Sequence, residues 1–398
     1  MVLKLARRLI TETDPAILAR FAWSFGVKGL AGMARFRRRL RNGGNFPAVL
    51  FVSVTSKCNL TCQGCWVGGG GEGHSMPADQ LDRLLADAEK QGCWFFGILG
   101  GEPLMYGPLW SVLRRRRDSY FQVFTNGTLL TDAVARQMRR LGNVTPLISI
   151  EGLAQTSDVR RGGVGVYGRS MAAIDRCRRS GLLTGVATSV CRSNIDELVN
   201  DEFLRELVRR GVHYLWYYIY RPVGPNPAPE LALSQEQVVR LRRFIVETRR
   251  RTPMLIVDAY WDHAGRAVCP AAEGVCYHVN PWGDIEPCPP VQFSADRLNG
   301  DGRGLFEVVN GSQFLRGFRD MAAGATPGCV LMERPDVLRQ FVIDRGARDS
   351  SGRGTALEEL ASAEGRCSQS TPGCEIPEAH WLYRFAKKRW FLGLGAYG

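Results

Sequence analysis

The stretch SKCNLTCQGCW, from Ser56 to Trp66, places Cys58, Cys62 and Cys65 in a C-x3-C-x2-C pattern directly after an apolar run. Three thiolates in so tight a loop can hold three irons of a [4Fe–4S] cluster and leave one iron open to chelate a ligand. A structural zinc site usually needs four ligands, so a zinc loop would lack one of them. Three unrelated cysteines are the remaining alternative, and the sequence beyond the loop favours the cluster.

The chain after this loop continues as an alternation of short apolar runs and helical patterns. With the run before the loop, six segments have strand character: 49–54, 94–99, 120–124, 146–150, 183–190 and 214–219. Helical patterns fill the gaps, near residues 77–90, 108–117, 131–141, 168–180 and 195–210. This alternation, with nearly continuous apolar strands, predicts a parallel sheet covered by helices. Six units are fewer than a closed eight-stranded barrel needs, so we expect an α/β fold with a partial (β/α)6 TIM-like barrel.

Short motifs follow the strands at their carboxyl ends. They are Gly100-Gly101-Glu102-Pro103, Thr125-Asn126-Gly127, Ser149-Ile150-Glu151-Gly152 with Asp158 and Arg161 downstream, Arg192-Ser193-Asn194, and Tyr220-Arg221-Pro222-Val223-Gly224. Each motif alone is weak, because a Gly-Gly turn after a strand is common and a serine at a strand end is often a cap. Their order matters more, because the carboxyl ends of parallel strands share the edge where ligands bind.

Taken in order, the cysteine loop and these motifs resemble the radical S-adenosylmethionine (radical SAM) enzymes over roughly residues 48–225. The resemblance implies that the loop holds a [4Fe–4S] cluster that binds SAM. It also implies that the GGEP motif lies at the methionine amine of SAM, and Ser149 with Arg161 at its carboxylate. The expected cofactor-binding residues are Gly100, Gly101, Glu102, Pro103, Asn126, Ser149, Glu151, Arg161 and Asn194.

The same resemblance implies a reaction. The reduced cluster donates an electron to SAM, the sulfonium C–S bond breaks homolytically, and the resulting 5′-deoxyadenosyl radical abstracts a hydrogen atom from a substrate. A reductase with flavodoxin or ferredoxin is the expected electron donor. The substrate stays open between a peptide, a lipid and a small molecule. A non-catalytic iron–sulfur or zinc scaffold is the alternative to an enzyme.

One position departs from the family's pattern. The residue before the third cysteine is usually aromatic and lies near adenine, whereas this chain has Gly64 there and Trp66 on the other side of Cys65. We still expect adenine near the loop, and the side chain that stacks on it stays open.

A second cysteine set begins at Cys269. Thirteen residues separate Cys269 from Gly283 and four separate Gly283 from Cys288, which resembles the C-x9–15-G-x4-C pattern of SPASM and twitch extensions. The segment 279–285 has the pattern of a small hairpin, and a helix is expected over 305–319. The later cysteines of a full SPASM set are absent, so we expect one auxiliary [4Fe–4S] cluster in a twitch-like arrangement, with structural zinc as the alternative. Its expected ligands are Cys269, Cys276, Cys288 and Cys329.

The other cysteines have simpler interpretations. Cys93, Cys177 and Cys191 fall in the barrel and are expected to pack as small hydrophobic side chains. Cys367 and Cys374 are interpreted as free thiols, with a second metal site as the alternative. Many cysteines without a signal peptide indicate a reducing, cytoplasmic location.

The predicted domains follow from changes in composition. Residues 1–47 are a basic helical segment, 48–225 the radical SAM core, 226–335 a twitch- or SPASM-like extension, and 336–398 a helical, basic tail. The boundary near 225 follows the proline-rich connection 221–229, and a helix near 234–251 comes next.

Basic charge is concentrated at the two ends of the chain. The 398 residues have a net charge of +13, yet residues 1–45 hold ten basic and two acidic side chains, and residues 376–398 hold four and one. The near-neutral middle argues against a nucleic-acid groove. A predicted helix over 14–41 and the aromatic, basic stretch 381–392 suggest peripheral contact with an anionic membrane. The alternative is that both segments pack on the barrel with their arginines in solvent.

Overall fold

The computed structural model describes residues 1–68, 73–298 and 302–389. Its main sheet contains six parallel strands that neighbour one another in chain order, as predicted. They are β1 (Val49–Ser53), β2 (Phe95–Leu99), β3 (Tyr120–Thr125), β4 (Val144–Ser149), β5 (Gly185–Val190) and β6 (Tyr214–Ile219). Most of their residues are buried, as expected for strands that are covered on both faces.

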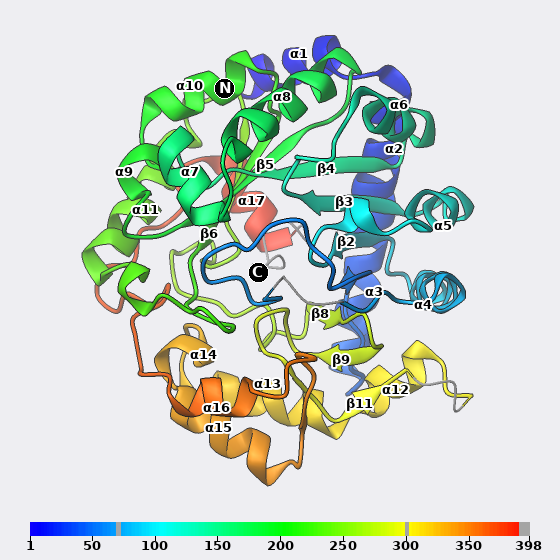
Figure 1. The fold of residues 1–398 in the computed structure, drawn as a ribbon, viewed down its shortest axis with the longest axis vertical. Helices are drawn as coiled ribbons and strands as arrows, with labels where there is room; N and C mark the ends of the chain where they lie inside the picture. Colours follow the sequence, from blue (N-terminus) through cyan, green and yellow to red (C-terminus); the bar gives the residue numbers. More distant parts are fainter. Residues whose placement is uncertain (69–72, 299–301, 390–398) are drawn as a thin grey trace.

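Helices occupy each gap between these strands and lie outside the ring that the strands form (Figure 1). They are α4 (Ala78–Lys90), α5 (Leu109–Arg115), α6 (Asp132–Leu141), α7 (Ala154–Arg161), α8 (Val166–Arg179), α9 (Ile195–Leu198) and α10 (Asp201–Arg209). Short 3₁₀ turns, η2 (Pro103–Met105) and η3 (Pro229–Leu231), follow β2 and β6. The α/β fold with a parallel sheet is therefore confirmed.

The sheet continues beyond the six predicted strands at both edges. On one side β7 (Leu255–Val257) pairs parallel with β6, and on the other β8 (Cys276–Val279) pairs parallel with β1. The hairpin predicted over 279–285 is formed by β8 and β9 (Asp284–Glu286), and β11 (Asp296–Arg297) follows β9. Within the described residues β7 and β11 are the two ends of the sheet order, so the barrel is partial.

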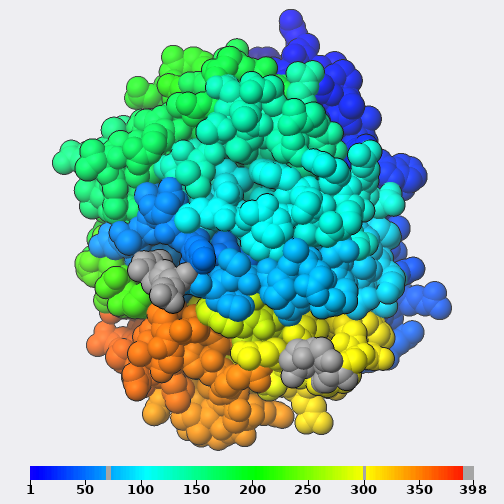
Figure 2. Space-filling model, turned by 45° about the vertical axis from the view of Figure 1, so that its right-hand side comes forward, coloured from blue at the N-terminus to red at the C-terminus, as the bar shows by residue number. Residues whose placement is uncertain are grey.

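The cysteine-rich region thus shares the main sheet instead of packing only beside it. Backbone pairing joins Val49 of β1 to Cys276 of β8, and Figure 2 shows the yellow and orange residues against the blue and cyan half of the barrel. This region also contains the two-stranded sheet of β10 (Phe293–Ser294) and β12 (Arg348–Asp349). The domain boundaries at 226 and 336 stay predictions.

The C-terminal half contributes the remaining helices. The predicted helix over 305–319 is divided, because the Ser312 hydroxyl accepts a hydrogen bond from the Leu315 amide and caps a new helix. The helices are α11 (Gln235–Thr248), α12 (Leu305–Gly311), α13 (Gln313–Ala325), α14 (Val330–Glu333), α15 (Pro335–Asp344), α16 (Ala356–Ala361) and α17 (Trp381–Arg389).

The N-terminal segment forms α1 (Val2–Glu12), α2 (Pro15–Phe21), a π-helical segment η1 (Ala22–Lys28) and α3 (Gly29–Arg41). Asp14 caps α2 and Pro15 begins it, as the sequence predicts. Phe25, Met33 and Phe36 are buried and form the face of this segment that packs on the core.

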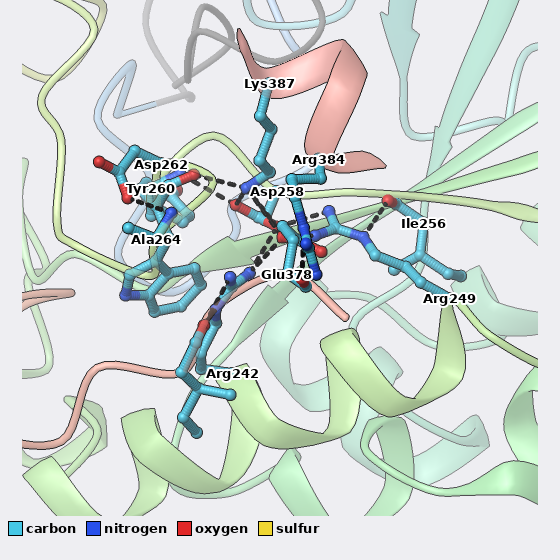
Figure 3. A network of polar contacts seen from close by, with 12 residues as sticks. Arg242, Arg249, Ile256, Asp258, Tyr260, Asp262, Ala264, Glu378, Arg384 and Lys387 are labelled. Atoms are coloured by element: carbon cyan, nitrogen blue, oxygen red, sulfur yellow. Dashed lines mark hydrogen bonds and ion pairs between the residues drawn. The ribbon is translucent and has the colours of Figure 1, made fainter. Parts of the chain in front are cut away.

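A buried network of charges fixes α17 to the barrel (Figure 3). Arg242, Arg249 and Lys387 surround the carboxylates of Asp258 and Glu378, and all five side chains are at most 3% exposed. Burial alone would raise the pKa of Asp258, but the three cations outweigh burial and hold that pKa well below its usual range. The carboxylate is therefore ionised inside the protein.

We expect Asp258→Asn to lower the free energy of unfolding by about 3–5 kcal/mol, because it leaves buried cations without a counter-charge. Asp262→Asn is the matched control: its partner Arg266 is 70% exposed, and such a pair contributes about 0–1 kcal/mol. Because the pKa of Asp258 is lowered by folding, its contribution is complete above about pH 4 and is lost as the pH falls further. Urea unfolding at several pH values measures both effects, and equal losses in the two variants would contradict the prediction.

Candidate active site

A cavity of about 290 Å³ opens at the carboxyl ends of the strands. Most of the predicted site residues line it: Cys58, Cys62, Cys65, Gly100, Gly101, Asn126, Ser149, Glu151 and Arg161. The predicted residues Glu102, Pro103 and Asn194 are not among its lining residues. The topology therefore brings the cysteine loop and the motifs after β2, β3 and β4 to one site, and Tyr220 and Arg221 after β6 line it as well.

The cysteine loop is held in place by its neighbours' backbones. The amides of Gly101 and Glu102 donate to the carbonyls of Thr55 and Lys57, both at 2.8 Å. A Cβ atom on Gly101 would lie 2.3 Å from the Lys57 carbonyl oxygen and 2.8 Å from the Cys58 Cβ. Only glycine permits this approach, which explains physically why a Gly-Gly turn follows β2.

The three thiols of the loop are half-buried and unbridged. Burial raises the pKa of the Cys58 thiol to about 12, so this sulfur ionises only beside a cation. Arg161 Nη1 donates to Cys62 Sγ at 3.7 Å. Within residues 1–68, 73–298 and 302–389, no three His, Cys, Asp or Glu side chains already have the arrangement that holds one metal ion. The soft donors, the N–H donor to sulfur and the adjoining cavity fit a cluster with an open iron.

Glu102 is completely buried and its carboxylate accepts three hydrogen bonds within the protein. It accepts hydrogen bonds from the Asn126 amide and the Thr125 hydroxyl, both at 2.8 Å, and from the Leu104 amide at 3.0 Å. Burial raises its pKa. In the structure this side chain joins the ends of β2 and β3 behind Gly100 and Gly101, and Pro103 starts the following turn.

Asn126 links β3 to the cysteine loop. Its Nδ2 donates to Asn59 Oδ1 at 2.9 Å, and its Oδ1 accepts from the Thr128 amide at 2.9 Å. Asn59 lies directly after Cys58 in the chain, so this contact holds the cysteine loop against the carboxyl end of β3.

Glu151 and Arg161 form a buried ion pair at the cavity wall. Arg161 Nη2 lies 2.9 Å from Glu151 Oε1, and Glu151 Oε2 accepts from the Ser189 amide at 3.1 Å. The Nε atoms of Arg160 and Arg161 are buried without a hydrogen-bond partner among the described residues. Two unpartnered donors on arginines that line the same cavity as Ser149 fit an anionic ligand group such as a carboxylate.

Asn194 supports this wall from behind. Its Nδ2 donates to the carbonyls of Glu151 and Ser189, both at 3.0 Å, and its Oδ1 accepts from the Cys191 amide at 2.7 Å. These bonds join the carboxyl ends of β4 and β5.

Gly64 stands where the family usually has an aromatic residue, and an aromatic ring from elsewhere in the chain, Tyr220, lies beside it. The φ of Gly64 is +67°, and a Cβ there would lie 2.0 Å from the Tyr220 hydroxyl oxygen, so the ring of Tyr220 occupies the position beside the loop. The Arg160 guanidinium lies 4.5 Å from the centroid of that ring. The sequence motif contained Tyr220, but nothing in the sequence identified Arg160 as its partner.

Comparison with known proteins settles the family of this region. A model described as Radical SAM superfamily matches residues 52–213. Residues 52–213 are a radical SAM domain. The family resemblance is thereby confirmed for residues 52–213, and the chain is an enzyme.

Two curated relatives of the radical SAM domain extend the match. The mycofactocin maturase MftC of Mycolicibacterium smegmatis is 26% identical over 315 residues, which are 74% of this chain and 78% of that protein. The pre-heme d1 synthase of Dinoroseobacter shibae is 29% identical over 237 residues, and the match spans only 54% of its length and 57% of this chain.

A solved structure supports the fold. The crystal structure of Streptococcus suis SuiB bound to S-adenosylmethionine has a TM-score of 0.59 and 16% identity, and the match covers 73% of this chain and 71% of that one. The family implies a [4Fe–4S] cluster and SAM as cofactors.

Arg221 connects the second thiol set to the radical SAM cavity. Burial is the main cause that raises the pKa of the Cys288 and Cys269 thiols, and neighbouring thiols are the next. Cys329 is one of these neighbours for both of them. Arg221, which lines the cavity, donates through Nε to Cys329 Sγ at 3.4 Å. Cys269, Cys288 and Cys329 are therefore neighbours around one arginine, although 60 positions separate the first from the last. This grouping matches three of the four predicted ligands.

Cys276 occupies a different environment. It is 2% exposed on β8, and after burial it is one of the smaller causes that raise the pKa values of Tyr218 and Tyr277. Its place in the auxiliary set stays a prediction.

Cys93, Cys177 and Cys191 pack inside the barrel as expected, and the interpretation of Cys367 and Cys374 as free thiols stays a prediction. Cys93, Cys177 and Cys191 are fully buried, and no disulfide joins any cysteine. Cys367 Sγ lies 3.0 Å from the Leu233 carbonyl oxygen, and Cys374 is exposed.

Proposed function

We propose that this chain cleaves SAM reductively at a [4Fe–4S] cluster held by Cys58, Cys62 and Cys65. When bound, the cluster supplies one electron, the SAM C5′–S bond breaks homolytically, methionine leaves, and the 5′-deoxyadenosyl radical takes a hydrogen atom from the substrate. The observation that carries this proposal is the shared cavity, which brings the three thiols beside Gly100, Ser149 and Arg161.

The lining of the cavity suggests how SAM is held. The loop Gly100-Gly101 presents backbone at the expected place of the methionine amine, and Ser149 with Arg161 presents donors for its carboxylate. Glu102 and Asn194, whose polar atoms are already used on backbone groups, support this arrangement from behind. We propose that their contribution to SAM binding is the position of the strand ends.

The direct test is the detection of 5′-deoxyadenosine after anaerobic incubation of the reconstituted protein with SAM and dithionite. A flavodoxin or ferredoxin with its reductase replaces dithionite in a second arm, because we propose such a donor. Formation of 5′-deoxyadenosine that depends on both reductant and iron is expected. Its absence from a protein that contains iron would refute the proposal and favour a scaffold.

Arg161→Ala should weaken SAM binding by roughly 100-fold, since a charge-assisted, bidentate arginine–carboxylate contact is lost from a buried site. Arg161→Lys keeps the positive charge but loses the planar pair of N–H donors. Its affinity for SAM should therefore lie between those of the wild type and Arg161→Ala. Equilibrium binding of SAM to the anaerobic protein measures the change, with the exposed Arg179→Ala as the control. Wild-type affinity in Arg161→Ala would show that the SAM carboxylate binds elsewhere.

We also propose that the second thiol set, Cys269, Cys276, Cys288 and Cys329, binds an auxiliary [4Fe–4S] cluster. Its support is the grouping of three of these thiols around Arg221, whose charge offsets thiolates in a buried site. Structural zinc on the same residues is the competing occupant, because thiolates suit either metal.

A mostly apolar groove of about 440 Å³ adjoins the cavity and shares Val223 and Pro290 with it. It runs between the proline-rich connection after β6 and α16, so we propose it as the route of the substrate. One relative is named a maturase, and one solved structure is SuiB bound to the precursor peptide SuiA. These two names favour an apolar peptide segment, whereas the pre-heme d1 synthase relative favours a small molecule as the alternative.

Filling the groove should exclude the substrate without stopping SAM cleavage. Ala363 lines the groove and is exposed, so Ala363→Trp should reduce the substrate that co-purifies anaerobically by at least about tenfold. Ala361→Trp on the same turn, outside the groove lining, is the matched control. Mass spectrometry measures the co-purifying substrate, and 5′-deoxyadenosine formation without substrate measures SAM cleavage. A blocked groove lowers only the first quantity, whereas a damaged active site lowers the second as well. Equal recovery from both variants would contradict this route.

A further inference from the structure

The helices from both ends of the chain lie at the end of the barrel opposite the cavity. Arg8 of α1 donates to the Pro253 and Val212 carbonyls, and the Ile256 amide donates to the Tyr383 hydroxyl of α17. These partners are in or beside the turns that lead into β6 and β7, at the amino ends of the strands. In Figure 1, α2, α3 and α17 lie behind the ring, away from the blue cysteine loop in front.

These helices expose apolar side chains on their outer faces while their inner faces pack on the barrel. Trp23, Val27 and Leu30 are 55%, 52% and 47% exposed, and their spacing of four and three residues puts them on one helical face. Leu3 of α1 is 86% exposed and Trp381 of α17 is 67% exposed. Of fourteen exposed large apolar side chains in the described residues, eight belong to these helices. A helix that is apolar on both faces normally has both faces covered.

Exposed cations accompany this apolar surface. No ion pair is found, within the described residues, for the exposed side chains of Lys4, Arg7, Arg38, Arg41 and Lys388. The two carboxylates of the N-terminal helices are already neutralised, Glu12 by Arg8 and Asp14 by Arg139. The surface is therefore both apolar and positively charged.

We propose that this terminal-helix surface, the outer faces of α1, η1, α3 and α17, docks onto an anionic lipid membrane. A helix that lies in the membrane interface typically combines apolar side chains such as tryptophan, leucine and valine with lysine and arginine. Anionic headgroups would supply the counter-charges that the described residues do not provide there. No helix among the described residues is long and apolar enough to cross a membrane.

A second copy of the chain is a poorer occupant. A two-fold symmetric contact places the same patch on both partners, so it would press the cations of one surface against those of the other. Docking through this surface also leaves the cavity facing away from the bilayer. The contact would thus determine where the enzyme works, and its substrate would arrive from the aqueous side.

The test is binding of the full, anaerobically purified chain to vesicles of phosphatidylcholine, with and without phosphatidylglycerol. We expect binding to the anionic vesicles to be at least about tenfold tighter, and to weaken as salt screens the charges. Trp23→Ser with Val27→Ser and Leu30→Ser should lower it by roughly tenfold or more. Arg38→Glu with Arg41→Glu should lower it by an independent route, through charge alone.

The matched control replaces three exposed apolar residues elsewhere, Leu153, Val159 and Val164, by serine. They are 49%, 68% and 92% exposed. If the vesicles adhered to any exposed apolar side chain, replacing these three should reduce binding at least as much as replacing Trp23, Val27 and Leu30. Unchanged vesicle binding in this control supports the proposal. Equal affinity for neutral and anionic vesicles, or no loss in either terminal-helix variant, overturns it. A dimer in solution that the Trp23, Val27 and Leu30 variant dissociates also overturns it, because a second copy then covers the surface.

Discussion

Replacing Cys58, Cys62 and Cys65 together with alanine should abolish the reductive cleavage of SAM. The three thiols line one cavity with Gly100 and Arg161, and soft thiolates are the ligands of iron–sulfur clusters. Without them no iron is held beside the SAM site, so no electron reaches the sulfonium. We expect 5′-deoxyadenosine to fall to the level of the reaction without reductant. Anaerobic reconstitution followed by chromatography of the products measures it.

The matched control removes three thiols that the fold uses differently. Cys93, Cys177 and Cys191 are fully buried in the barrel, and their replacement by alanine should leave SAM cleavage in place, with some loss of stability. If the Cys58, Cys62 and Cys65 variant still forms 5′-deoxyadenosine, the loop does not hold the catalytic cluster. If both triple variants lose activity and unfold, stability explains the loss, and single replacements at Cys58 and Cys93 then decide the matter.

The fold and much of the candidate site could be predicted because they depend on local pattern. Apolar runs of five or six residues, each followed by a helical pattern, specify six parallel strands, and their carboxyl ends must share an edge. Gly101 is an example at a single residue: the local Gly-Gly pattern after a strand indicates a turn, and the missing side chain leaves room for the Cys58 loop. The cavity then follows from topology alone.

Contacts between distant segments could not be predicted. Nothing near Arg221 in the sequence indicates that it donates to Cys329, which is 108 positions away. The same holds for Arg160 against Tyr220, and for the pairing of β8 with β1, which brings the cysteine-rich region into the main sheet. The charges of α17 suggested a solvated or membrane-facing helix, whereas Lys387 is buried between Asp258 and Glu378. Each of these depends on tertiary packing, which periodicity does not record.

The predicted segment 381–392 extends past the described residues. Its described part, Trp381–Arg389, is the helix α17, and residues 390–392 lie outside the described part of the chain. The interpretation that this segment packs on the barrel therefore holds for the inner face of the helix, and membrane contact of its outer face stays a proposal. The inner face carries Tyr383 and Lys387 into the barrel, while Trp381 and Phe385 are exposed.

Iron analysis of the wild-type chain should give about eight irons, in two [4Fe–4S] clusters. Replacing Cys269, Cys288 and Cys329 together with alanine should reduce the count to about four. These thiols are neighbours around Arg221, as Cys62 is beside Arg161, and an N–H donor to sulfur stabilises a cluster's negative charge. The variant should also melt at a lower temperature, because binding free energy at such a site is folding free energy.

The metal content of this variant separates the remaining arrangements. About four irons with one zinc in the wild type would assign the second site to structural zinc, and the auxiliary cluster would be wrong. Cys276→Ala and Cys367→Ala test the fourth ligand in parallel, because Cys276 acts on Tyr218 while Cys367 contacts the Leu233 carbonyl. If only Cys276→Ala lowers the iron count, the predicted set of four is correct. If neither does, Cys269, Cys288 and Cys329 would hold the second cluster without a fourth thiol from this pair, beside an arginine that also lines the cavity.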